Sequence, residues 1–157
     1  MTGMTMMSGA VKPLADLPQF KEVLTILDNP IVAILVGAGI TALIQSSAAS
    51  LGILQSLAMT GSISFSMALP VIMGQNIGTC ITALLSSIGT TKSAKRVTAV
   101  HIYFNVLGTV ICLSGFYIAN SIFHFTFTDQ PISSFMIAVV HSTFTVSYTH
   151  LTLPTIR

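Results

Sequence analysis

Two polar clusters interrupt the apolar part of this sequence, and they contain the residues best suited to binding chemistry. The first reads Gln45-Ser46-Ser47-Ala48-Ala49-Ser50, and the second reads Gly74-Gln75-Asn76-Ile77-Gly78-Thr79. Hydroxyl and amide groups can donate hydrogen bonds to a small anion and can offer neutral oxygens to a hard cation. No Arg, Lys, Asp or Glu accompanies them, so the clusters predict a binding site and argue against carboxylate-based catalysis.

Two histidine-containing patterns follow the second cluster. His101 and Asn105 are four residues apart and so share one face of a helix, and His141 recurs in a related His-x-x-Phe pattern. No third ligand stands at a metal-binding spacing. With no acidic partner in the apolar segments and no G-x-S-x-G context, the sequence does not predict an enzyme. We interpret His101 as a hydrogen-bonding group between helices. A place on a substrate pathway, together with Asn105, is the alternative.

The composition indicates that membrane helices position these residues. Apolar residues make up 52% of the 157 residues and charged residues only 6%, against roughly 25% charged in a soluble domain. No charge occurs between Asp28 and Lys92 or between Arg96 and Asp129. Each gap exceeds the ~20 residues that a membrane-spanning helix needs. We therefore expect an all-α membrane protein in contact with the lipid bilayer. The net charge of +2 does not suggest a nucleic-acid partner.

The first apolar block, residues 31–59, is too long for one straight span and too short for two. Its first half, Ile31 to Ile44, would extend about 21 Å as a helix, less than the ~30 Å hydrocarbon core. The first polar cluster begins where this half ends. We therefore predict a re-entrant helical hairpin, since a break at membrane depth is tolerated where it is buried in protein or lines a wet cavity. One long tilted helix is the alternative.

The rest of the chain is expected to form three further helices between two terminal segments. The predicted helices are 66–88, 97–120 and 132–146. Residues 1–30 read as an interfacial amphipathic linker. Residues 147–157, SYTHLTLPTIR, interrupt the last helix and are interpreted as a non-native tail.

The basic residues predict the orientation of the chain. The loop 89–96 contains Lys92, Lys95 and Arg96 and no acidic residue, so we expect it on the cytoplasmic side. The first 30 residues hold two basic and three acidic residues, which fits the opposite side. A single crossing by 66–88 connects these sides only if 31–59 returns to the side from which it entered, which favours the hairpin.

Three segments together resemble a known family. They are ITALIQSSAASLGILQSLAMTG, ALPVIMGQNIGTCITALLSSIGT and AKRVTAVHIYFNVLGT. In this combination they resemble the type II sodium-dependent phosphate cotransporters, in particular bacterial members. The resemblance covers most of residues 3–145. The family's serine run is commonly longer, and Ala48 stands here in place of its third serine.

The resemblance implies a site, a substrate and an architecture. Members contain two inverted repeats, each with a QSS motif on a re-entrant hairpin, and bind sodium and phosphate where the hairpins meet. Carried over, and with Ser50 added from the same cluster, the expected substrate- and ion-binding residues are Gln45, Ser46, Ser47, Ser50, Asn76, Gly78 and Thr79. Na+ is the expected coupling ion, and no cofactor is implied.

On this resemblance the chain is expected to be the second repeat of a sodium:phosphate symporter. Its partners would be inorganic phosphate, Na+, the missing first repeat and a PhoU-like domain that many bacterial members carry. The expected location is the cytoplasmic membrane of a bacterium. Two alternatives stay open: a channel-like or other small-anion transporter half, and a helical membrane subunit without transport activity.

Overall fold

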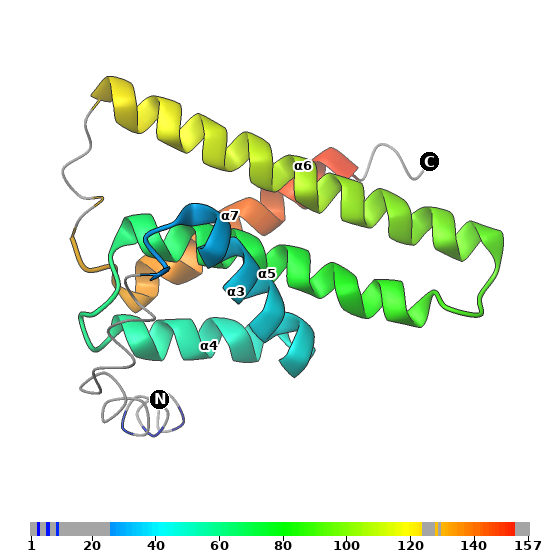
Figure 1. Cartoon of the computed structure of the whole chain (residues 1–157), viewed down its shortest axis with the longest axis horizontal. Coiled ribbons are helices and arrows are strands. Elements are labelled where there is room, and N and C mark those ends of the chain that lie inside the picture. The colour runs from blue at the N-terminus through cyan, green and yellow to red at the C-terminus, as the bar shows by residue number, and fades with distance from the viewer. Residues whose placement is uncertain are drawn as a thin grey trace.

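The computed structural model describes residues 26–123, 128 and 130–152, together with the single positions Gly3, Met6 and Gly9 (Figure 1). Five helices make up the described chain: α3 (Pro30–Ile44), α4 (Ser47–Ala58), α5 (Phe65–Ser86), α6 (Lys92–Phe123) and α7 (Ser134–Thr152). Among these residues there is no strand, which confirms the all-α expectation. The linker predicted over residues 1–30 lies almost wholly outside the described residues.

The first apolar block is divided into two short helices at Gln45 and Ser46. Pro30 opens α3, and the Asn29 side chain caps it by accepting a hydrogen bond of 3.0 Å from the Ile31 N–H. α3 ends at Gln45, whose φ of 57° is left-handed and whose N–H bonds to the Thr41 carbonyl. Ser46 then caps α4 by accepting a bond from the Ala49 N–H at 3.3 Å. The QSS sequence therefore encodes the end of one helix and the start of the next. The single long helix weighed as an alternative is wrong.

The remaining helices differ from their predicted bounds by a few residues. α5 and α6 are long and apolar enough to cross a membrane. α6 begins at Lys92, within the segment expected as a loop. Its 32 residues extend about 48 Å, well beyond a ~30 Å hydrocarbon core, so a basic first turn can stand in the headgroup region. α7 continues to Thr152, so the expectation that the helix is interrupted at residue 147 is wrong. The interpretation of residues 147–157 as a non-native tail stays a prediction.

α5 lies at the centre and packs against all four other helices (Figure 1). Its closest neighbour is α3, because glycines stand where the two backbones meet. A Cβ added at Gly74 would run into the Ile34 backbone, and one at Gly37 would run into the Val71 carbonyl. Gly78 faces Ala38 and Thr41 in the same way. This small-xxx-small contact is the packing that lets apolar helices associate without a hydrophobic driving force between them.

The connections before α5 and before α7 meet at one end of the molecule. The Phe65 N–H donates to the Gln130 carbonyl at 3.2 Å, and the Ile132 N–H donates to the Ile63 carbonyl at 3.0 Å. A reciprocal pair joins α4 to α7, in which Gln55 Nε2 donates to the Ser134 carbonyl and Ser134 Oγ donates to the Gln55 carbonyl, each at 3.1 Å. These bonds fix the start of α7 beside the end of α4 and so set which face of α7 turns toward α5.

Candidate functional site

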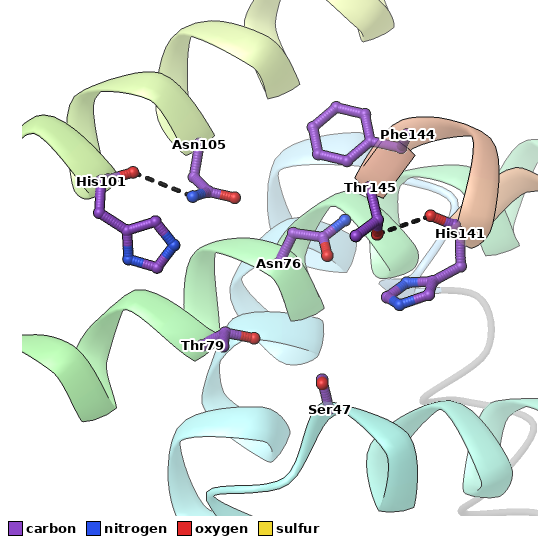
Figure 2. Close-up of a pocket in the computed structure, with 8 residues that line it drawn as sticks. All are labelled: Ser47, Asn76, Thr79, His101, Asn105, His141, Phe144 and Thr145. Carbon is purple, nitrogen blue, oxygen red and sulfur yellow. Dashed lines mark hydrogen bonds between the residues drawn. The ribbon is translucent and has the colours of Figure 1, made fainter. Parts of the chain in front are cut away.

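A polar cavity of about 240 Å³ lies between four helices. The lining side chains come from α4, α5, α6 and α7 (Figure 2). α4 contributes its first residue, α5 its middle, and α6 and α7 one histidine-containing turn each. The lining residues are Ser47, Asn76, Thr79, His101, Asn105, His141, Phe144 and Thr145.

The QSS cluster reaches this cavity through Ser47 alone. Ser47 is the first residue of α4, so the N-terminal end of that helix borders the cavity. Gln45 is exposed and acts as the left-handed cap of α3. Ser46 caps α4, and Ser50 is buried against α3. None of these three lines the cavity, so the structure does not bring the predicted cluster to one point.

The second cluster divides between two faces of α5. Asn76 and Thr79, three residues apart, face the cavity. Gly74 and Gly78, four residues apart, face the α3 backbone. Gly78 therefore serves helix packing in this structure and does not line the cavity, although we had expected it among the binding residues.

Asn76 and His141 are the two lining residues that have a buried polar atom without a hydrogen-bond partner among the described residues, and Asn76 lies on the central helix α5. The Asn76 side chain is only 9% exposed, and its Nδ2 atom has no hydrogen-bond partner among the described residues. Figure 2 places it centrally among the other lining side chains. A buried amide nitrogen without a partner is costly unless a ligand or water supplies an acceptor. Asn76 is thus poised to donate to a bound solute.

The hydroxyl of Thr79 acts toward the cavity as an acceptor, in contrast to the donor Nδ2 of Asn76. It donates its proton to the Gln75 carbonyl within its own helix at 3.0 Å, a back-bond typical of hydroxyls in apolar helices. Its oxygen can then act toward the cavity only as an acceptor. The floor of the cavity on α5 therefore offers one donor side chain and one acceptor side chain, one helical turn apart.

α6 contributes the predicted pathway residues. His101 and Asn105 both line the cavity, and Asn105 Nδ2 donates to the His101 carbonyl at 2.9 Å (Figure 2). Asn105 is 5% exposed, so this bond fixes a buried amide at the cavity edge. The i, i+4 spacing correctly predicted that the two residues share a face.

α7 contributes three residues that the sequence prediction did not include: His141, Phe144 and Thr145. Thr145 Oγ1 donates to the His141 carbonyl at 2.8 Å, which repeats the Asn105–His101 bond of α6. The signal was present in the recurring His-x-x-Phe pattern. Only the packing of α7 on α4 and α5 brings that pattern to the cavity.

The described residues offer no obvious site for a tightly held metal. No group of three or more His, Cys, Asp or Glu residues gathers among them. None of the eight lining residues is Asp, Glu, Lys or Arg. The cavity suits a solute bound by neutral dipoles.

Comparison with known proteins relates the chain to transporters. The family described as Na+/Pi-cotransporter matches residues 1–128. Protein YqeW of Bacillus subtilis (strain 168), described as uncharacterized, is 39% identical over 102 residues, which are 64% of this chain and 33% of that protein. No solved structure matches the chain.

Two mammalian relatives are named for their activity. Sodium-dependent phosphate transport protein 2A of Rattus norvegicus is 38% identical over 94 residues, 56% of this chain and 15% of that protein. Sodium-dependent phosphate transport protein 2B of Homo sapiens is 35% identical over 101 residues, 60% of this chain and 15% of that protein. The chain thus spans a third or less of the length of these relatives.

Proposed function

The chain belongs to the Na+/Pi-cotransporter family, a family of transporters and not of enzymes, and we propose that it forms one repeat of a sodium-coupled phosphate symporter. The proposed location is the bacterial cytoplasmic membrane, where the sodium gradient drives phosphate uptake by alternating access. Since the chain spans only part of its relatives, the activity is assigned to the whole gene product, in which the inverted first repeat is proposed to complete the site.

α3 and α4 are proposed to form a re-entrant hairpin with its tip at Gln45 and Ser46. Three features support this path. Each helix, at 15 and 12 residues, is shorter than the ~20 residues of a full span. The break is stabilised by its own caps. In Figure 1 the chain returns after the break toward the end of the molecule where α3 begins.

The single observation that carries the proposal is the convergence of both polar clusters on one cavity. Ser47 from the first cluster and Asn76 and Thr79 from the second line the same space, although Ser47 and Asn76 are 29 positions apart in the sequence. The helix break is what allows this, because it ends α3 and starts α4 beside the middle of α5. An unbroken helix would carry Ser47 past that point.

Phosphate is proposed to bind to the donor groups of the cavity. Asn76 Nδ2 offers N–H groups that lack a partner among the described residues. The N-terminal end of α4 adds the partial positive charge and free backbone N–H groups that favour anions. Binding by neutral donors keeps the anion exchangeable, since no fixed cation of the lining residues would hold it.

Sodium is proposed to bind beside the anion through neutral oxygens. Thr79 Oγ1 presents only lone pairs to the cavity because its proton is used within α5. Neutral oxygen ligands suit a hard monovalent cation when a nearby anion balances its charge. The absence of Asp and Glu from the lining residues makes the two solutes depend on each other's charge, which is the physical basis proposed for their coupling.

The test is uptake of radiolabelled phosphate by proteoliposomes that contain the gene product carrying this chain. We expect accumulation with an inward Na+ gradient and none when choline replaces Na+. Uptake that continues unchanged in choline would overturn sodium coupling and favour a channel-like or other small-anion transporter. A folded protein that takes up no phosphate in either buffer would favour a helical subunit without transport activity.

A further inference from the structure

The polar cavity has an apolar neighbour, and one side chain borders both. An apolar groove of about 520 Å³ lies between α6 and α7, and Phe104, Ile111, Cys112 and Val140 are among its lining residues. Phe144 is the one residue that lines both the groove and the polar cavity. A single aromatic ring therefore stands between a space suited to hydrated ions and a space suited to hydrocarbon.

The repeated His-x-x-Phe pattern explains this position. On each helix the histidine and the residue four positions later face the cavity, and the phenylalanine three positions after the histidine is turned to one side. On α6 that turn carries Phe104 wholly into the groove. On α7 it leaves Phe144 at the border of the two spaces.

Gly108 of α6 provides room for the ring. A Cβ added at Gly108 would lie 3.2 Å from Phe144 Cζ, closer than ordinary van der Waals contact. Among the described residues α6 and α7 each pack on α5 but make few backbone contacts with each other. The ring of Phe144, set against the bare backbone at Gly108, thus bridges the gap between the two helices.

We propose that Phe144 is a hydrophobic seal that separates the solute cavity from the α6–α7 groove. A charged solute in hydrocarbon is strongly disfavoured, so a transporter whose cavity opened sideways would lose its ions' binding energy and admit lipid tails. The seal acts by position and not by a bond to the solute. The role of the seal does not depend on which solute occupies the cavity, so a negative result for the seal would not count against the proposed phosphate site.

The native cysteines provide the test. Cys112 lines the groove, whereas Cys80 is 2% exposed and belongs to neither space. In a Cys80→Ala background, the gene product in liposomes is treated with a membrane-impermeant quaternary-ammonium methanethiosulfonate, and the rate of Cys112 modification is measured by mass spectrometry. Cys112→Ser identifies the background signal.

We expect Phe144→Ala to speed Cys112 modification at least about tenfold, because water then reaches the groove through the cavity and the charged reagent does not cross hydrocarbon. The matched control is Phe104→Ala, which removes the same ring from the groove alone and should leave the rate unchanged. Phe144→Val should give an intermediate rate and serves if the alanine variant does not fold. Equal rates in the wild type and the folded Phe144 variants, or an equal increase for Phe104→Ala, would overturn the proposal.

Discussion

Thr41 Oγ1 donates a hydrogen bond of 3.0 Å to Ser50 Oγ, and both side chains are 1% exposed. The bond joins the last turn of α3 to the first turn of α4 across the break at Gln45 and Ser46. It holds the two short helices beside each other in an apolar interior, where neither hydroxyl could find water. Ser50, which we expected to bind solute directly, instead holds α4 against α3 next to the break.

Thr41 and Ser50 should contribute to the free energy of unfolding as a coupled pair. Thr41→Val and Ser50→Ala should each lower the free energy of unfolding by about 1 kcal/mol, the usual net value of such a bond. The double variant should cost less than the sum of the two, because one bond is lost in all three. Denaturant unfolding in mixed micelles measures this. Ser86→Ala is the control, since Ser86 Oγ bonds only within α5, and additive single effects would contradict the coupling.

Two glycines of α3 should respond oppositely to alanine. Gly37→Ala should destabilise by more than about 2 kcal/mol, because its Cβ would meet the Val71 carbonyl of α5 and both backbones would have to move apart. Gly39→Ala, two residues away with nothing within 4 Å, should be neutral or stabilising by up to about 1 kcal/mol through helix propensity. Thermal unfolding of the purified protein distinguishes them. Equal effects at the two positions would refute the close packing of α3 on α5.

The Gln45 position should separate a backbone role from a side-chain role. Gln45→Gly and Gln45→Ala both remove the amide, but glycine adopts the observed φ of 57° without strain. The glycine variant should therefore be more stable than the alanine variant by about 1 kcal/mol. Phosphate uptake by Gln45→Gly should persist if the residue acts by capping α3. Lost uptake in a folded glycine variant would instead restore Gln45 as a binding residue.

Asn76 should be the side chain on which phosphate affinity depends most. Asn76→Ala removes a buried donor that lacks a partner, so the KM for phosphate should rise at least about tenfold, equivalent to about 1.4 kcal/mol. Initial uptake rates over a range of phosphate concentrations measure it. An unchanged KM in a folded variant would remove Asn76 from the proposed site.

A pair of threonines on α5 tests the sodium contact. Thr79→Val removes the oxygen that faces the cavity and should raise the Na+ concentration for half-maximal uptake several-fold, by roughly 1 kcal/mol. Thr82→Val removes a similar back-bonded hydroxyl that does not line the cavity, since Thr82 Oγ1 donates to the Thr79 carbonyl at 2.7 Å. It should leave the sodium dependence unchanged. The same shift in both variants would point to helix stability and away from ligation.

The sequence predicted those features that depend on neighbouring residues. The length of the apolar segments predicted helices, and the polar Gln45–Ser46 step in a segment too short for two spans predicted the break. The i, i+4 spacing of His101 and Asn105 predicted their shared face. The predicted helix bounds were less accurate, as at Lys92 and Thr152. Polarity marks where a chain leaves the apolar region, but the backbone hydrogen bonds of a helix can continue for several residues beyond that point.

What only the tertiary structure decided is which face of each helix meets the cavity. Consecutive residues on a helix point about 100° apart, so a cluster that is continuous in sequence cannot all face one space. Asn76 and Thr79 therefore face the cavity while Gly74 and Gly78 face α3, and Ser47 lines the cavity while Ser50 is buried against Thr41. His141, Phe144 and Thr145 enter the site because α7 is fixed beside α4 by the Gln55–Ser134 pair, a contact between residues 79 positions apart that no local pattern specifies.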